Sequence, residues 1–150
     1  MSSKQFINKR ARHEYEILDR REAGIALKGS EVKSVREGKV TFTDSFVHIK
    51  KGEAYLYNLH IAPYSATGHF TDDPKRERRL LLHKKEIRSL MLTLTQKGLT
   101  LIPLRIYFKK GLVKVEIGMA RGRKLYDKRQ KLKERAIKRE IEQTLRGKRF

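Results

Sequence analysis

Hydrophobic and polar side chains alternate over much of this chain, a pattern typical of strands that bury one face. The alternation is clearest over 104–108 and 113–119, two runs separated by the turn sequence Lys109-Lys110-Gly111. These runs predict a β-hairpin. A second hairpin is predicted around Lys50-Lys51-Gly52, and its second strand is expected to run unbroken from Ala54 to Ile61.

The N-terminal part of the chain has a weaker pattern. Residues 1–7 are expected to form a loose start. Short alternating stretches at 15–17 and 23–27 flank the polar group Asp19–Glu22, which suggests a hairpin-like turn between two strands. A short helix from Glu31 to Glu37 is predicted next, because two valines lie three residues apart before a glycine.

A long loop and a helix are predicted in the middle of the chain. Residues 62–79 contain two prolines and no periodicity, and a loop of this length is usually functional or mobile. Apolar residues then recur at helical spacing from Leu82 to Leu94. Gly98 is expected to end this helix after Lys97.

The pattern as a whole predicts a mainly β, α+β fold with about six strands and two inserted helices. Strands with one apolar face indicate antiparallel pairing around a single core. No regular βαβ alternation is present, so a closed barrel fits better than a doubly wound sheet. We therefore predict an OB-type antiparallel β-barrel with flanking helices, formed by residues 1–120.

Residues 121–150 are predicted to form a separate basic tail. The segment contains 13 Lys or Arg and 4 Asp or Glu, so self-repulsion opposes compact folding and favours a polyanionic partner. Its apolar stripe is thin, and isolated helices of this length are marginal in water. We expect the tail to be disordered in the free protein and helical when bound.

Basic charge also extends through the rest of the chain. The whole sequence has 37 Lys or Arg against 17 Asp or Glu, a net charge of +20, and its pI is near 10.4. Nucleic acid and acidic membrane surfaces are the partners that fit this charge. Basic clusters at 9–13, at 74–79 and in the tail favour RNA or DNA. Tyr55 and Tyr57 could stack on unpaired bases, but core packing is the preferred interpretation.

The sequence lacks the usual patterns of an enzyme or a metal site. It has no cysteine, which excludes disulfides and thiolate ligands, and its five histidines lack metal-ligand spacing. No glycine-rich phosphate loop or Gly-x-Ser-x-Gly elbow is present. We expect no catalytic residue, no metal and no cofactor. A nuclease is the enzymatic alternative, but it requires an acidic metal-binding cluster that we cannot assemble.

The pattern also argues against contact with a membrane. The N-terminal residues are too polar for a signal peptide, and no apolar run approaches the roughly 18 residues that a spanning helix needs. The tail lacks a broad apolar face. We expect a cytoplasmic protein with no membrane contact. A generic ribosomal or single-strand-binding OB protein would also explain the charge, but not two separate functional ends.

Several long strings carry more information than composition. They are NKRARHEYEIL at 8–18, EAGIALKGSEVKSVREGKV at 22–40, DSFVHI at 44–49, DPKRERRLLLHKKEI at 73–87 and KGLTLIPLRIYFKKGLVKVEIGMARGRKLYDKR at 97–129. In this order they closely resemble the small protein B family, the bacterial SsrA-binding proteins. The resemblance covers nearly the whole chain from Asn8 onward.

The resemblance implies an OB-type barrel and a non-enzymatic role in ribosome rescue. Members of the family bind the tRNA-like domain of tmRNA. They deliver alanyl-tmRNA to stalled ribosomes together with GTP-bound elongation factor Tu, and so enable trans-translation. The C-terminal tail is then expected to enter the ribosome at the 16S rRNA decoding centre and the mRNA channel. A monomer is expected.

The resemblance also implies roles for individual residues. The expected tmRNA-binding set is Asn8, Lys9, Arg10, Arg12, His13, Glu22 and Leu81. Amide and carboxylate groups can hydrogen bond to base edges or ribose, and a leucine can pack on a base. The expected ribosome-acting set in the tail is Gly122, Lys124, Tyr126, Asp127, Lys128 and Arg129. Some relatives carry histidine at the position of Tyr126, and either ring could stack on a decoding-centre base.

Overall fold

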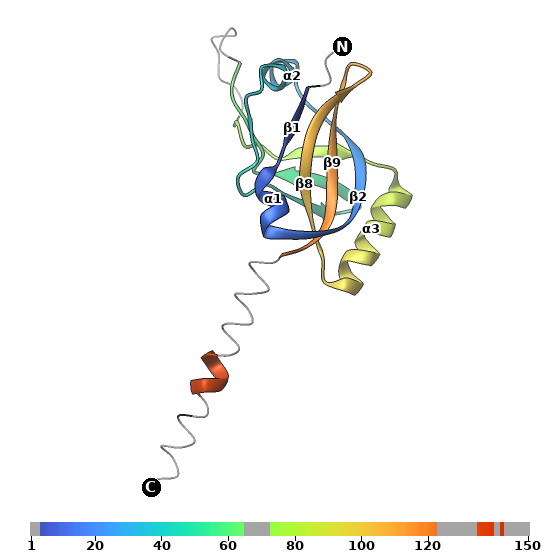
Figure 1. Ribbon diagram of the computed structural model, residues 1–150. Coiled ribbons are helices and arrows are strands. Elements are labelled where there is room, and N and C mark those ends of the chain that lie inside the picture. Colours follow the sequence, from blue (N-terminus) through green and yellow to red (C-terminus); the bar gives the residue numbers. More distant parts are fainter. Residues whose placement is uncertain (1–3, 65–72, 123–134, 140–141, 143–150) are drawn as a thin grey trace.

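The structure is a computed structural model that describes residues 4–64, 73–122, 135–139 and 142. Strands and helices alternate irregularly along these residues (Figure 1). The elements are β1 (Gln5–Ile7), α1 (Lys9–Glu14), β2 (Tyr15–Ile25), α2 (Gly29–Arg36), β3 (Val40–Thr41), β4 (Phe46–Lys50), β5 (Glu53–Tyr57), β6 (His60–Ile61), β7 (Arg78–Leu81), α3 (Lys84–Lys97), β8 (Thr100–Lys109) and β9 (Leu112–Gly122).

Six of the described strands close into an antiparallel ring in the order β8-β4-β5-β7-β2-β9. The ring closes because β9 pairs with β8 as well as with β2. Strand β1 adds to the free part of β8, while β3 and β6 form a small separate sheet. Helices α2 and α3 lie near opposite ends of the barrel (Figure 1). The predicted OB-type antiparallel barrel with flanking helices is therefore confirmed.

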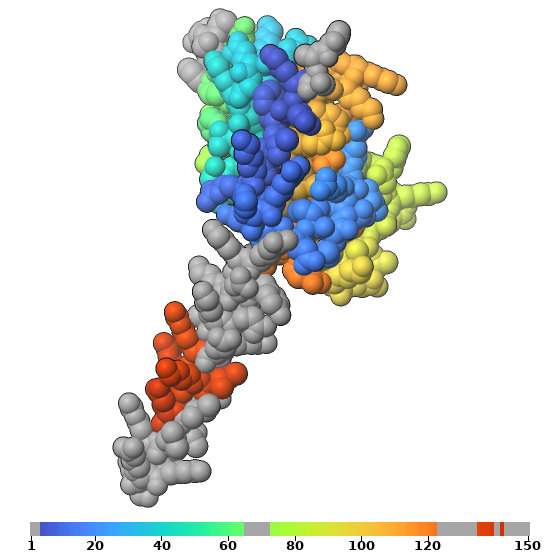
Figure 2. All heavy atoms as spheres, viewed as in Figure 1, coloured from blue at the N-terminus to red at the C-terminus, as the bar shows by residue number. Residues whose placement is uncertain are grey.

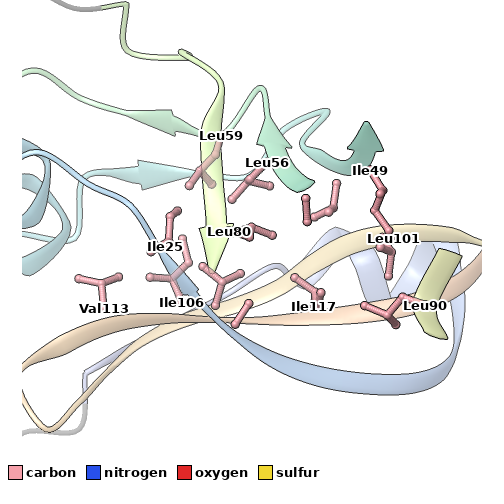
Figure 3. Close-up of a cluster of buried hydrophobic side chains, with 14 of the residues drawn as sticks. Ile25, Ile49, Leu56, Leu59, Leu80, Leu90, Leu101, Ile106, Val113 and Ile117 are labelled. Atoms are coloured by element: carbon pink, nitrogen blue, oxygen red, sulfur yellow. The ribbon is translucent and has the colours of Figure 1, made fainter. Parts of the chain in front are cut away.

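The inward positions of the ring form one hydrophobic core. Leu56 and Leu80 point into it from β5 and β7, and Ile106 and Ile117 point into it from β8 and β9 (Figure 3). Their relative exposure is at most 1%, so alternate residues of these strands are removed from water. Burial of a side chain of this size stabilises the fold by about 1.5–3 kcal/mol. The outward positions are left free to carry charge.

Strand β2 corrects the prediction for the N-terminal third. The polar group Asp19–Glu22 was expected to form a turn, but the chain runs as one strand from Tyr15 to Ile25 beside β9. Asp19 and Arg21 form an ion pair of 2.6 Å and stay partly exposed, so their polarity needs no turn. A register shift between Ile17 and Asp19 marks a local irregularity instead.

The second predicted hairpin is correct in its turn but wrong in the length of its second strand. Strand β5 ends at Tyr57, and Asn58 has a positive φ of 60°. This left-handed residue reverses the alternation. Leu59 is consequently buried, whereas Tyr55 and Tyr57 alternate with fully buried neighbours and lie on the outer face. The expectation that the two tyrosines pack in the core is wrong.

Two other segments contain more structure than their patterns indicate. Strand β1 lies inside segment 1–7, so the expectation of a loose start is wrong for Gln5–Ile7, and helix α1 follows directly. Figure 2 shows these dark-blue residues on the outside of the barrel, where β1 pairs with β8. Strand β7 begins at Arg78, inside the predicted loop, of which residues 65–72 are outside the described part. Helix α3 ends at Gly98, whose φ of 63° is the expected left-handed cap.

Candidate nucleic-acid interface

Glu22 lies on the outer face of β2 and is held there by two residues of β8. The Tyr107 hydroxyl donates a hydrogen bond to its carboxylate, and Lys109 Nζ lies 3.3 Å from both carboxylate oxygens. The hydrogen bond from Tyr107, with a further one from Lys109, lowers the pKa of Glu22. The side chain keeps 38% of its surface exposed. A carboxylate has about four lone-pair sites, so Glu22 can still accept hydrogen bonds from a ligand.

Alternating charges surround this carboxylate on the same face. Arg105 on β8 lies over the Tyr107 ring, with 4.2 Å between the guanidinium carbon and the ring centroid. Its guanidinium also binds Glu116 at 3.2 Å and Gln5 at 2.9 Å. Burial and the hydrogen bond to Glu22 raise the pKa of Tyr107, so the ring stays neutral and donates its proton. These contacts fix the orientation of Glu22 before any ligand arrives.

Leu81 extends the face of Glu22 onto the neighbouring strand. It pairs with Gly24 of β2 and has 47% relative exposure, although leucine is normally buried. A Cβ at Gly24 would lie 3.2 Å from the Cβ of Leu81, so glycine lets the leucine lie against the strand. This exposure excludes ordinary core packing, the usual role of a leucine in a strand. An exposed leucine next to an oriented carboxylate offers a nucleotide base an apolar contact and a hydrogen-bond acceptor side by side.

Asn8 has a structural role that its sequence motif does not indicate. Its Nδ2 donates to the Pro103 carbonyl at 2.9 Å, and its Oδ1 accepts from the Ala11 N–H at 3.4 Å. Asn8 is therefore the N-cap of α1 and ties this helix to β8. Ala11, the buried residue of α1, packs against Ile102, Leu104 and Ala120.

The basic side chains of α1 point away from the barrel as a consequence. Lys9, Arg10, Arg12 and His13 are all exposed. Arg10 has a neighbour of opposite charge in Glu14, at 3.5 Å along the helix. Exposed cations on a helix that is fixed at both ends can meet phosphates without reorganising the fold.

A hollow of about 350 Å³ lies beside α1. Its walls come from the helix, the start of β8 and the segment between β3 and β4, and they include Asn8, Arg10, Tyr15, Asp44 and Phe46. The volume is in the range of small-ligand pockets. The hollow therefore adds a concave part to the surface beside α1.

The second basic cluster, at 74–79, is divided between the core and the surface. Arg78 has no exposed surface, and its guanidinium binds Glu31 at 2.6 Å and the Leu59 carbonyl at 2.6 Å. Arg76 binds the other oxygen of Glu31 at 2.5 Å. Burial raises the pKa of Glu31, but hydrogen bonds from Arg76, the Lys28 N–H and Arg78 outweigh it, so the pKa is lowered. The interpretation of this cluster as a set of phosphate contacts is wrong for Arg78.

Most of the predicted ribosome-acting residues are outside the described part of the chain. These are Lys124, Tyr126, Asp127, Lys128 and Arg129. Gly122 is described, and it ends β9 in register with Tyr15. The barrel thus continues two residues past the predicted boundary at 120. In the tail, which was expected to be disordered in the free protein and helical when bound, residues 135–139 are described and are helical.

Candidates for a metal site and for a membrane-spanning helix are absent from the described residues. No group of three or more His, Asp or Glu side chains there could hold a metal ion. None of the helices described is long and apolar enough to cross a membrane.

The sequence pattern also contained a signal that the prediction did not use. The alternation of Leu104, Ile106 and Phe108 requires Arg105, Tyr107 and Lys109 to face outward. These three residues surround Glu22, but nothing in the sequence indicates that β2 and β8 lie on either side of β9.

Comparison with known proteins supports one family. The family model described as SmpB protein matches residues 5–147. SsrA-binding proteins of Sulfurihydrogenibium and Aquifex aeolicus are 57% and 56% identical, over 94% of this chain and 93% and 90% of their own lengths. The SsrA-binding protein of Thermus thermophilus is 56% identical, over 91% of this chain and 95% of its own length.

A solved structure has the same fold. It is described as "tmRNA-SmpB: a journey to the center of the bacterial ribosome", is 58% identical in sequence and superposes with a TM-score of 0.67. The match covers 79% of this chain and 83% of that chain.

Proposed function

The chain belongs to the SmpB protein family, and from this premise we propose that it binds the tRNA-like domain of tmRNA and acts in trans-translation. The observation that carries the proposal is the exposed Glu22 carboxylate, which Tyr107 and Lys109 orient next to an exposed Leu81. Net charge alone would attract any nucleic acid. An oriented acceptor beside an apolar side chain favours a ligand with unpaired bases.

In the proposed complex each part of the surface has a different task. Glu22 accepts a hydrogen bond from a base amine or a 2′-hydroxyl, and Leu81 packs against a base. Lys9, Arg10, Arg12 and His13 contact phosphates. Asn8 contributes mainly by holding α1, because both ends of its amide already have protein partners.

The proposed cycle continues on the ribosome. A single copy of the chain brings alanyl-tmRNA, with GTP-bound elongation factor Tu, to a stalled ribosome in the cytoplasm. The tail then enters the 16S rRNA decoding centre and the mRNA channel. Gly122, Lys124, Tyr126, Asp127, Lys128 and Arg129 act there. This role is binding and placement, with no catalytic step of the chain's own.

Co-purification tests the class of ligand most directly. The full chain is isolated from bacterial cells at low ionic strength, and the bound RNA is sequenced. We expect one abundant species of tmRNA. A heterogeneous mixture that follows total cellular RNA would contradict the proposal and would favour a generic basic protein.

Truncation tests the division between barrel and tail. Because β9 extends to Gly122, the truncated chain should end there rather than at residue 120. We expect residues 1–122 to keep most of the affinity for the tRNA-like domain and to lose peptide tagging on stalled ribosomes. A truncated chain that still supports tagging would contradict the role of the tail.

A further inference from the structure

A row of aromatic side chains lies on the outer face of β4 and β5. In the antiparallel register Phe46 is opposite Tyr57, and His48 is opposite Tyr55. The residues between them, Val47 on β4 and the inward positions of β5, are buried. All four rings therefore project from the barrel on the same side.

Three rings of this row are in contact, with Tyr57 between the other two. Phe46 and Tyr57 are stacked, with ring centroids 5.1 Å apart and an interplanar angle of 13°. The His48 ring lies 6.4 Å from the Tyr57 ring, tilted by 57°. Phe46 keeps 40% relative exposure in this arrangement. Phe46, Tyr57 and His48 thus form a contiguous aromatic surface, and contiguous exposed apolar surface is typical of a binding site.

Cations border the aromatic row. Lys50 Nζ lies 5.0 Å from the Tyr55 ring centroid and 5.8 Å from that of Tyr57. Arg79 of β7 pairs with Tyr55 and is about half exposed. Each cation has an acidic neighbour, Glu77 at 3.0 Å from Lys50 and Glu53 at 3.9 Å from Arg79. Aromatic rings with cations close to them, in a strongly basic chain, match the chemistry of single-stranded nucleic acid.

The row is continuous with the face described above. Arg79 lies two residues before Leu81 on β7, and Leu81 pairs with Gly24, two residues after Glu22. Successive residues on one face of a β-strand are separated by about 7 Å. This distance is close to the spacing of nucleotides in an extended RNA chain. A single-stranded segment leaving the Glu22 site can thus follow β7 onto β5 and β4.

We propose that Phe46, His48, Tyr55 and Tyr57 form a stacking platform for unpaired RNA bases, separate from Glu22 and bordered by Lys50 and Arg79. The platform rests on the proposed RNA-binding function and extends its surface across the barrel. Stacking is indifferent to base identity, so the platform contributes affinity for unpaired segments rather than sequence specificity. Phosphates of the bound strand compete with Glu77 and Glu53 for the two cations.

The test uses the full chain and a labelled single-stranded oligouridylate of about ten nucleotides, with a duplex RNA of the same length as comparison. Binding is measured at about 0.15 M salt, where purely electrostatic contacts are weakened. The variants are Phe46→Ala, Phe46→Leu, Tyr57→Ala and Tyr57→Phe. Leu92→Ala on α3 is the matched control, since Leu92 is 61% exposed on another element.

We expect Phe46→Ala and Tyr57→Ala to lose about tenfold in affinity for the oligouridylate, a change of about 1.4 kcal/mol, and to lose little for the duplex. Phe46→Leu should lose almost as much, because it keeps an apolar side chain without a ring. Tyr57→Phe and Leu92→Ala should bind normally. Equal losses for the two RNAs, or normal binding by Phe46→Leu, would overturn the platform.

Two further measurements keep the test decisive. If an alanine variant does not fold, the ring signals of Phe46 and Tyr57 in the wild-type NMR spectrum still report stacking, and oligouridylate should shift them; unmoved signals would overturn the platform. Glu22→Ala is titrated in parallel with the tRNA-like domain of tmRNA and with oligouridylate. The proposed function fails if that variant binds the tRNA-like domain normally, whereas the platform fails if the ring variants bind oligouridylate normally.

Discussion

Glu31 and Glu22 are both acidic residues held by basic or hydroxyl neighbours, but one lies inside the molecule and the other on its surface. Glu31 has 7% relative exposure and joins α2 to Arg76 and Arg78. Glu22 joins β2 to Tyr107 and Lys109 across the outer face. In the Glu31 cluster the arginine side chains donate to Glu31 and to backbone carbonyls. In the Glu22 cluster the carboxylate keeps acceptor positions open to solvent.

The comparison teaches that burial, rather than charge, separates a structural cluster from a binding site. Removing one partner of a buried pair leaves an uncompensated charge and is strongly destabilising. Removing one partner of an exposed pair changes stability by about 1 kcal/mol or less. The basic residues of the two clusters look alike in the sequence, so the distinction depends on the fold.

Glu31→Ala should have the largest effect on stability. It leaves the fully buried Arg78 guanidinium without its carboxylate, at a cost of about 3–5 kcal/mol. Urea unfolding at neutral pH, with Glu22→Ala as the matched control, measures the difference. A loss below about 1 kcal/mol for Glu31→Ala would show that the two clusters do not differ as described.

Acid should destabilise the fold in part through the buried Glu31 cluster. The folded-state pKa of Glu31 is lowered, so its contribution is fully present above the unfolded pKa of about 4.3 and is lost as pH falls through the folded value. Unfolding free energy, measured from neutral pH to about pH 3, should therefore fall less steeply in Glu31→Gln than in the wild type. Parallel curves would contradict the pKa direction.

Asn8→Ala should have an intermediate effect. It removes the cap of α1 and the link to Pro103, at a cost of about 0.5–2 kcal/mol. Because α1 carries the exposed cations, RNA affinity should fall together with the helical order of 9–14. Amide hydrogen exchange of α1 separates these effects: weaker binding with unchanged α1 protection would mean that Asn8 contacts RNA directly.

Tyr107→Phe should have the smallest effect on stability. It removes one partly exposed hydrogen bond, and about 0.5 kcal/mol is expected. The pKa of Glu22 should rise towards its ordinary value, because the Tyr107 hydroxyl is the main cause of its lowering. An NMR titration of the Glu22 side chain measures this shift, and an unchanged pKa would argue against the oriented carboxylate.

The alternating pattern of the sequence predicted the antiparallel barrel, but it did not predict some local features of the strands. The β8–β9 hairpin was predictable because apolar and other residues alternate without interruption over 104–108 and 113–119 in the sequence. The break at Asn58 was not, since asparagine only permits a left-handed conformation and does not require it. As a result, Tyr55 and Tyr57 were assigned to the core.

The candidate site was predictable only in part. Resemblance to the family indicated Glu22 and Leu81, and the roles of these residues stay predictions. Their proximity depends on the β2–β7 pairing, which joins residues far apart in the sequence. The pairing of Glu31 with Arg78 was not predictable for the same reason, since the two residues are far apart in the sequence. A basic cluster has the same sequence whether its side chains contact a phosphate or a buried carboxylate.

Titration of Glu22→Ala with the tRNA-like domain of tmRNA tests the central claim most directly, with Leu92→Ala as the control. We predict a loss of about tenfold or more in affinity at an unchanged urea midpoint, because the removed carboxylate is exposed and contributes little to stability. Unchanged affinity in a folded variant would contradict the account.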